Sequence, residues 1–199
     1  AHSVVAWSLA LAAAWACPAA AQATAPLDRL QRVERAGVLR VCIWPEYYGI
    51  TWRDPKTQQL SGLDVDMARE LARELGVEPR FVDSSFARLI DDVGADRCDI
   101  AMFAIGITPA RTARLRFARP HLQSDIYAIT TKANRMVRSW DDIDRPGVVV
   151  AVARGTVHEG VMRDRLKAAT LKVVDTPNAR EQEVESGRAD VFMTDYPYS

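Results

Sequence analysis

The hydrophobic positions of the first half of the chain alternate between strand-like runs and helix-like repeats. We expect strands at 38–44, 80–83 and in the near-continuous apolar run 99–107. The two segments between them carry apolar residues at three- and four-residue spacing, as amphipathic helices do. A β-α-β-α-β order predicts a doubly wound, parallel sheet with helices on both faces.

Local signals set the predicted boundaries of these elements. We expect a first helix at 27–36 that ends before Gly37, and a long loop at 45–59. Asp64 is the predicted N-cap of the second helix. Ser85 is the predicted N-cap of the third, which would carry Phe86 on its apolar face.

The second half of the chain repeats this order after an extended segment at 125–132. The pattern predicts helices that begin at the Thr156–Glu159 capping box and at Thr176–Pro177. Their flanking strands are expected at 148–152, 171–174 and 190–194. The sequence therefore predicts a second α/β lobe, although the halves share no detectable sequence repeat.

The first 23 residues contain no Asp, Glu, Lys or Arg, and an apolar core runs from Val4 to Ala16. Together with the small residues at Ala21 and Ala23, this predicts a secretory signal peptide cut after Ala23. A lipoprotein attached at Cys17 is the alternative, with a poor lipobox. The segment is too short and too rich in alanine for a membrane anchor.

The composition excludes several classes of partner. Lys plus Arg and Asp plus Glu number 26 each and are scattered, which gives no sign of a nucleic acid or an anionic membrane surface. Cys42 and Cys98 remain after signal removal, and an even pair in an oxidising compartment suggests a disulfide, with two buried thiols as the alternative. We expect no metal site and no cofactor.

One arginine stands where a cation is locally unfavourable. Thr108 and Pro109 read as an N-cap and a first helical residue, which places Arg111 in the first helical turn. Free N–H groups and the helix dipole make that turn partly positive. A small anion bound there would resolve the conflict; a solvated arginine is the alternative. Four aromatic residues after the first strand suggest a pocket wall, namely Trp44, Tyr47, Tyr48 and Trp52.

Four motifs follow one another in a familiar order: 62–76 (Gly-Leu-Asp-Val-Asp-Met-Ala onward), 98–101 (Cys-Asp-Ile-Ala), 107–111 (Ile-Thr-Pro-Ala-Arg) and 117–120 (Phe-Ala-Arg-Pro). The chain thereby resembles bacterial extracellular solute-binding protein family 3, the amino-acid-binding proteins of ABC importers. The resemblance implies the periplasmic binding protein type II fold, in which two doubly wound parallel-sheet lobes are joined by a hinge. It also implies adjacent strands for the two cysteines.

The domains follow from this resemblance: signal peptide 1–23, the N-terminal part of lobe 1 at 24–126, and hinge and incomplete lobe 2 at 127–199. In the family the chain returns to the first lobe after the last of these strands. We therefore expect the C-terminal part to be missing after Ser199.

The resemblance also assigns ligand-binding roles. It places the ligand α-carboxylate on Arg111 and the α-ammonium on Asp195. Family members often have serine where Ala104 and Gly106 stand, and a hydroxyl residue where Val157 stands. The remaining implied contacts are Thr108 and Thr156 near the carboxylate, and Tyr47, Phe86 and Trp44 around the side chain.

Trp44 replaces a frequent acidic residue, which favours an apolar or aromatic ligand over a basic one. His158 could contact the ligand, but a lone histidine in the first turn of a helix is more often exposed, so neither it nor His121 is counted among the contacts.

These observations predict a periplasmic, non-enzymatic, monomeric binding protein that delivers an amino acid or similar small carboxylate to an inner-membrane ABC permease. The first alternative is an enzyme similar to cyclohexadienyl dehydratases, which share this fold. Such an enzyme needs a pocket acid, and no carboxylate follows Asp195 in this chain. The second alternative is the sensing module of a signalling protein, in which a transmembrane helix would follow.

Overall fold

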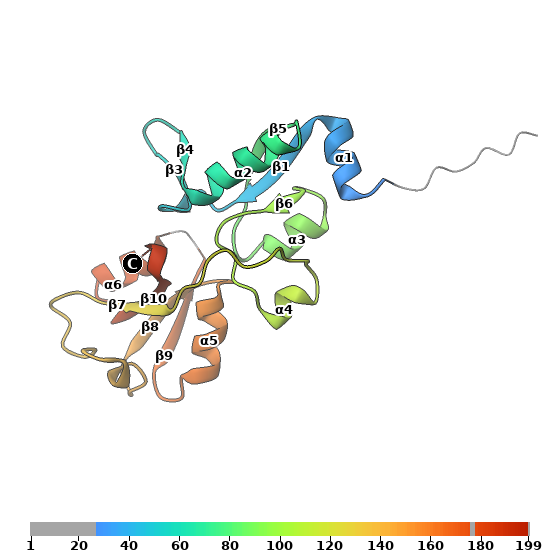
Figure 1. Cartoon of the computed structure of the whole chain (residues 1–199). Helices are drawn as coiled ribbons and strands as arrows, with labels where there is room; N and C mark the ends of the chain where they lie inside the picture. The colour runs from blue at the N-terminus through green and yellow to red at the C-terminus, as the bar shows by residue number, and fades with distance from the viewer. Residues whose placement is uncertain (1–26, 176–177, 199) are drawn as a thin grey trace, which may run out of the picture.

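The computed structural model describes residues 27–175 and 178–198, which form two lobes built around separate sheets (Figure 1). The sheet of the first lobe has the order β5 (Glu78–Asp83), β1 (Val38–Ile43), β6 (Ile100–Ala101), and both pairings are parallel. Val41 and Cys42 of the central strand pair with β5 on one side and β6 on the other. The central strand is therefore shielded on both edges.

The second sheet has four strands, in the order β7 (Ile126–Ile129), β10 (Val191–Asp195), β8 (Val149–Ala153), β9 (Thr170–Val174). The pairings of β10 with β8 and of β8 with β9 are parallel. The edge strand β7 runs antiparallel to β10. The segment 125–132 was expected to be extended, and the hydrogen bonds of β7 assign it to the second sheet.

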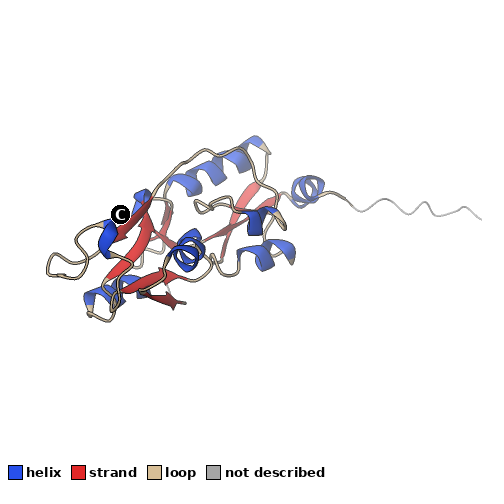
Figure 2. Cartoon of the chain, turned by 90° about the horizontal axis from the view of Figure 1, so that it is seen from below, coloured by secondary structure: helices blue, strands red, loops and turns tan. Residues whose placement is uncertain are grey.

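Helices cover both faces of the first sheet, as Figure 2 shows from below. Because side chains alternate along a strand, Leu39, Val41 and Ile43 face α1 (Arg29–Ala36) and α2 (Leu63–Glu74), where Val33, Ala68 and Ala72 pack against them. Cys42 points to the opposite face, where Leu89 of α3 (Leu89–Gly94) lies. This arrangement is the doubly wound lobe that the alternating pattern predicts.

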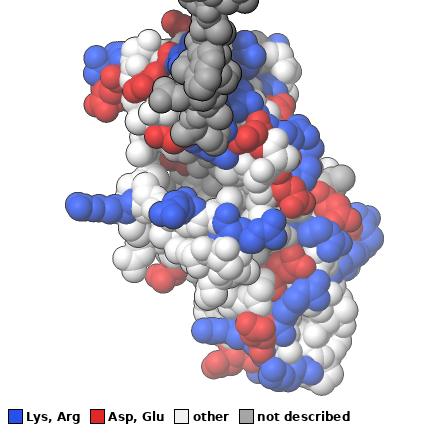
Figure 3. All heavy atoms as spheres, turned by 90° about the vertical axis from the view of Figure 1, so that its right-hand side faces the viewer, with Lys and Arg blue, Asp and Glu red and all other residues white. Residues whose placement is uncertain are grey.

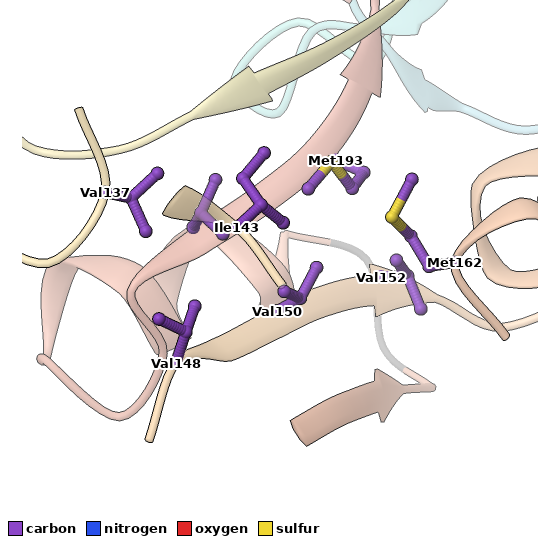
Figure 4. Close-up of a cluster of buried hydrophobic side chains, with 8 residues drawn as sticks. Val137, Ile143, Val148, Val150, Val152, Met162 and Met193 are labelled. Atoms are coloured by element: carbon purple, nitrogen blue, oxygen red, sulfur yellow. The ribbon is translucent and has the colours of Figure 1, made fainter. Parts of the chain in front are cut away.

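The second lobe repeats the arrangement with α5 (Val157–Arg165) and α6 (Ala179–Glu185). Figure 4 shows its largest buried cluster, in which Met162 of α5 meets valines of β8 and Met193 of β10. On the other face Ala151 and Phe192 pack against Val184 of α6. Three short helical segments complete the described chain: α4 (Pro109–Thr112), η1 (Trp140–Asp142) and η2 (Tyr196–Tyr198).

A disulfide joins the first lobe to itself between Cys42 and Cys98, with Cα atoms 5.5 Å apart. Cys42 lies in β1, and Cys98 comes two residues before β6, the strand that pairs with β1. The structure thus forms the expected disulfide, with Cys98 in the segment that leads into the adjacent strand β6 rather than on the strand itself. It closes a chain segment with a sequence separation of 56 residues.

Two strand predictions are wrong. The run expected as a strand at 99–107 pairs with β1 only at Ile100–Ala101, because the backbone turns away from the sheet at Ala104, where φ is +49°. The segment 45–59, expected as a loop, contains β2 (Glu46–Tyr47) and β3 (Thr51–Arg53), which form an antiparallel meander with β4 (Leu60–Ser61). Strands of two or three residues are too short to produce a readable alternation.

Two predicted caps are also wrong. The N-cap of α2 is Gly62, with φ at +123° and Ile50 so close that an added Cβ would lie 2.4 Å from its carbonyl oxygen. Asp64 lies instead in the first turn, where it is 1% exposed. The hydroxyl of Ser85 accepts a hydrogen bond from the amide of Arg88, but α3 begins only at Leu89. Phe86 therefore lies in the turn before the helix.

The predicted signal peptide at 1–23, including Cys17, and the predicted helix start at Thr176–Pro177 lie outside the described residues. Among the helices that are described, none is long and apolar enough to cross a membrane. On the face shown in Figure 3, Lys and Arg lie among Asp and Glu over most of the surface. The scattered charges of the sequence thus remain interspersed on this face.

Candidate functional site

A cavity of about 700 Å³ lies between the lobes. Its wall includes seven of the nine predicted ligand-binding residues, namely Trp44, Tyr47, Phe86, Ala104, Gly106, Thr156 and Asp195. Thr108 and Arg111 are not part of the wall, and Arg111 lies behind Gly106. The structure thus gathers residues from both lobes around one space, with the predicted anion-binding arginine just beyond it.

Aromatic rings form one side of this cavity. Trp44 lies with its ring centroid 5.3 Å from that of Tyr47 and 5.4 Å from that of Phe86. Phe86 in turn meets Phe103 edge to face at 4.9 Å. Edge-to-face pairs of this kind hold their rings in fixed orientations. The wall is therefore apolar and rigid.

The other two aromatic residues of the predicted pocket wall lie elsewhere. Tyr48 and Trp52 pack on each other with centroids 5.7 Å apart, and neither lines the cavity. Tyr48 is 66% exposed. Trp52 pairs with Glu46 in the β2–β3 ladder and so points to the face opposite Tyr47, and Tyr48 lies in the turn after β2.

Arg111 is a buried cation in the first turn of α4, as predicted from the sequence. Thr108 is the N-cap and accepts from the amide of Arg111, with Pro109 at the first helical position. The guanidinium is 5% exposed and donates to the carbonyl oxygens of Gly106 at 2.6 Å and Gly155 at 2.9 Å. Burial lowers the pKa of this guanidinium.

The partners of Arg111 come from both lobes and are all neutral. Gly106 belongs to the first lobe and Gly155 to the second, and the ring of Phe86 lies 5.6 Å from the guanidinium carbon. Within residues 27–175 and 178–198 no carboxylate forms an ion pair with Arg111. A buried cation without a counter-charge is unusual, and it favours a bound anion.

Asp195 and Tyr47 meet across the lobe boundary. Asp195 ends β10, and its Oδ2 accepts a hydrogen bond from the hydroxyl of Tyr47, which is 2% exposed. Burial, with a contribution from the charge of Asp195, raises the pKa of this hydroxyl, so it stays a donor. The second oxygen, Oδ1, is buried and has no hydrogen-bond partner among the described residues.

The lobes touch at two glycines. A Cβ on Gly155, where φ is +76°, would lie 2.6 Å from Cα of Ala87 in the first lobe. A Cβ on Gly106 would lie 2.7 Å from Cγ2 of Val157 in the second lobe. Gly106 and Val157 are two positions at which the family resemblance implies hydroxyl residues, and in the structure they face each other. The missing side chain at one position thus makes room for the branched one at the other.

Two predicted contacts are already satisfied within the protein. The amide of Ala104 donates to Oδ2 of Asp64 at 2.7 Å, so it is not free for a ligand. The hydroxyl of Thr156 donates to the carbonyl oxygen of Ala153 at 2.7 Å and caps α5 by accepting from the amide of Glu159. Glu159 does not complete the expected capping box, because its carboxylate accepts from Gly155.

His158 is the residue that sequence reasoning missed. Expected to be exposed, it is 7% exposed and lines the cavity, and its Nδ1 has no hydrogen-bond partner among the described residues. Burial lowers the pKa of its imidazole to about 4, with Arg180 and Arg111 acting in the same direction and Asp195 against them. Its position two residues after the Thr156 cap was the available signal, since that end of α5 faces the first lobe.

Arg180 is a second buried arginine that the sequence did not single out. It is 4% exposed, pairs with Glu181 at 2.8 Å and donates to the carbonyl oxygen of Met193 at 3.1 Å. Its guanidinium carbon lies 4.6 Å from the ring centre of Tyr198. Unlike Arg111, this arginine has a carboxylate partner of its own.

The buried imidazole of His158 predicts a pH-dependent stability. Its pKa of about 4 in the folded state lies below the ordinary value of 6.5, so between these values the unfolded chain binds more protons. Stability is therefore lost as the pH falls through this window, by roughly 2 kcal/mol between pH 7 and pH 5 from this group. In thermal unfolding, the decrease in Tm from pH 7 to pH 5 should be smaller in His158→Gln.

The control is Gln59→Ala, because Gln59 is exposed and carries no titratable group. This variant should show the same decrease in Tm as the unmodified protein. Equal decreases in all three proteins would contradict the burial of a neutral imidazole at position 158.

Comparison with known proteins relates this arrangement to others. Residues 39–172 match the family model of the bacterial extracellular solute-binding proteins, family 3. Cyclohexadienyl dehydratase of Pseudomonas aeruginosa is 34% identical over 178 residues, which are 89% of this chain and 66% of the relative. The L-cystine-binding protein TcyJ of Escherichia coli K12 is 25% identical over 167 residues, 83% of this chain and 62% of the relative.

The chain therefore spans slightly less than two thirds of the length of these relatives. Among solved structures, it is similar to the ancestral amino-acid-binding protein AncCDT-1, described as a precursor of cyclohexadienyl dehydratase. The TM-score is 0.79 with 32% identity, and the match covers 84% of this chain and 74% of the other. Both a binding protein and an enzyme are thus among the similar proteins.

Proposed function

This chain belongs to family 3 of the bacterial extracellular solute-binding proteins, and from that premise we propose that it captures an amino acid or a similar small carboxylate for delivery to an ABC permease. Its two lobes have the periplasmic binding protein type II fold. The observation that carries the proposal is Arg111, a buried cation at the lobe boundary whose described partners are all neutral.

The carboxylate end of the ligand belongs at Arg111. The two hydrogen bonds to carbonyl oxygens use two of the five N–H groups of a guanidinium, which leaves donors for an anion. Because the site is desolvated, a carboxylate gains more here than it would in water. The carbonyl oxygen of Gly155 in the second lobe occupies one of the donors of Arg111, so separation of the lobes frees that donor for an incoming carboxylate.

The ammonium end belongs at Asp195. Its Oδ1 is buried without a described partner, and a primary ammonium group supplies the missing donor. The unpartnered Nδ1 of His158 lines the same cavity and is available as a second acceptor, since the low pKa keeps the imidazole neutral. Together the arginine and the carboxylate act as a two-ended clamp for a zwitterion.

The ligand side chain lies against Trp44, Tyr47 and Phe86. These rings offer an apolar surface, and Trp44 is 7% exposed. These three rings carry no charge, so an apolar or aromatic side chain suits this wall better than a basic one. A basic side chain would have to reach Asp64, which lines the same cavity with a buried Oδ1 that has no hydrogen-bond partner among the described residues.

Binding proceeds by hinge closure, with lobe 1 at 24–126 and the hinge and lobe 2 at 127–199. The pairs Arg111–Gly155 and Tyr47–Asp195 join one lobe to the other, so they form only when the lobes close. Family membership and the predicted signal peptide support a periplasmic location. The permease is the partner that the family implies, and the binding protein acts as a monomer.

A thermal-shift screen of the full-length protein against the twenty amino acids and related carboxylates tests this function. A ligand at a hundred times its dissociation constant adds roughly 2.7 kcal/mol to the free energy of unfolding. At least one amino acid should raise the Tm, and an apolar or aromatic one more than lysine or arginine. No shift from any compound at millimolar concentration would refute the proposal.

A dehydratase is the second candidate, because one of the relatives with 34% identity is cyclohexadienyl dehydratase. Such chemistry needs a protonated group placed to donate. His158 lines the cavity, but a pKa of about 4 leaves it almost entirely neutral at pH 7. An assay with prephenate and arogenate separates the candidates, since turnover by the purified protein would favour the enzyme and binding without turnover would favour transport.

A further inference from the structure

The hydroxyl of Tyr47 forms a hydrogen bond with Asp195, which Tyr47 would not need if it only lined the side-chain pocket. Tyr47 lies in β2 of the first lobe, and Asp195 ends β10 of the second lobe. The hydroxyl of Tyr47 donates to one carboxylate oxygen, Oδ2, and the other oxygen, Oδ1, stays buried and unpartnered among the described residues. The two oxygens of one carboxylate are thus in different situations.

The surroundings of Tyr47 hold its ring in place. Its backbone accepts from the amide of Ile50 at 3.0 Å, and β2 pairs with β3 at Tyr47 and Thr51. The ring packs against Trp44 at 5.3 Å and Tyr198 at 5.9 Å between centroids. Because the ring of Tyr47 is held in place, its hydroxyl fixes the orientation of the Asp195 carboxylate.

The orientation of the Asp195 carboxylate matters because this carboxylate lines the cavity. Asp195 lines the cavity together with His158, and both contribute an acceptor that has no partner among the described residues. With Oδ2 committed to Tyr47, the unpartnered Oδ1 is the oxygen left for a donor group in the cavity. A free carboxylate would rotate between equivalent orientations and lose part of this directionality.

We propose that Tyr47 is a positioning residue for amine recognition, whose hydroxyl turns Asp195 so that Oδ1 meets the amino group of the ligand. The proposal rests on the proposed function and makes its substrate class more specific, namely carboxylates with a primary amine. Tyr47 and Asp195 belong to opposite lobes, so the amino group is recognised fully only after closure. A ligand without an amine gains from the tyrosine hydroxyl only its contribution to lobe closure, which both ligand types share.

The experiment compares each amino acid that binds with its analogue lacking the amino group, by calorimetry on the full-length protein. For L-phenylalanine the analogue is 3-phenylpropionate. Tyr47→Phe keeps the ring and removes the donor. It should weaken amino-acid binding roughly tenfold more than it weakens binding of the analogue. The hydrogen bond that helps closure is lost for both ligands, whereas the orientation of the carboxylate matters only to the amine.

Two further variants make the test specific. In Asp195→Asn the same amine-dependent loss should appear, and adding Tyr47→Phe to it should cause little further loss, because the tyrosine acts through the carboxylate. Tyr48→Phe is the matched control: Tyr48 is 66% exposed, so neither ligand should be affected. No side chain at position 47 that lacks a hydrogen-bond donor should restore the difference in affinity between the amino acid and its analogue.

Each possible result of these measurements either supports or contradicts the positioning role of Tyr47. A larger loss for ligands with an amine than for their analogues supports the positioning role. An equal loss for both ligand types would limit the hydroxyl of Tyr47 to a role in lobe closure, and no loss would show that its hydroxyl is irrelevant; either result overturns the proposal. Should the unmodified protein bind the analogues but no amino acid, the positioning role fails while carboxylate capture survives. Binding of neither class refutes the proposed function itself, and the positioning role with it.

Discussion

Replacing Arg111 with alanine is expected to weaken ligand binding by about 30-fold to several thousand-fold. Loss of a hydrogen-bonded charge from a desolvated site typically costs roughly 2–5 kcal/mol, and each 1.4 kcal/mol is a factor of ten in affinity. Arg111 is 5% exposed, and it donates to carbonyl oxygens of both lobes. Its removal therefore takes away the anion-binding group and one connection that forms on closure.

Calorimetry on Arg111→Ala and Arg111→Lys measures this effect with any ligand found in the screen. The lysine variant retains the charge but not the planar fork, so it should recover only part of the affinity. Arg114→Ala is the matched control, since Arg114 is exposed and lies one turn further along. Unchanged affinity in Arg111→Ala would mean that the carboxylate binds elsewhere.

Removing the Cys42–Cys98 disulfide is expected to reduce the free energy of unfolding by about 4 kcal/mol, according to the chain-entropy relation for a loop of this size. The bond has a sequence separation of 56 residues, and both cysteines are fully buried at 0% exposure. For a protein of this length a loss of that size lowers the Tm by roughly 8–16 °C. Urea unfolding of the oxidised and the reduced protein measures the difference.

The double variant Cys42→Ala, Cys98→Ala provides a comparison that does not depend on reductant. Ligand affinity should change little in it at temperatures where it stays folded, because neither cysteine lines the cavity between the lobes. Equal unfolding midpoints for the oxidised and reduced forms would contradict a stabilising role for the bond.

The sequence predicted best those features that depend on local patterns. The Thr108–Pro109 start of α4 and the first-turn position of Arg111 follow from capping chemistry, and the structure contains both. The alternation of strand and helix gave the order of elements in both lobes. These signals are local, so one chain suffices to detect them.

The features that were missed depend on contacts between distant segments. The apolar run beyond Ala101 leaves the sheet because Ala104 turns toward Asp64, forty positions earlier, and residues 103–107 then line the cavity. A buried strand and a cavity wall require the same apolar residues, so periodicity cannot separate them. His158 was missed for a related reason, because the charged groups around its imidazole, Asp195, Arg180 and Arg111, come from segments far from it in the sequence.

The facing positions Gly106 and Val157 impose an order on how this pocket can change. A serine at position 106 would place its Cβ 2.7 Å from Cγ2 of Val157. If this substitution came before a smaller residue at position 157, it would hold the lobes apart. The reverse order is open, since trimming Val157 first only leaves space. A mutant library that randomises position 106 alone would thus return glycine, whereas a library that varies both positions reaches pockets with a hydroxyl on either side. Substitutions at the two positions are therefore expected to be non-additive, with a change at Val157 tolerated before a change at Gly106.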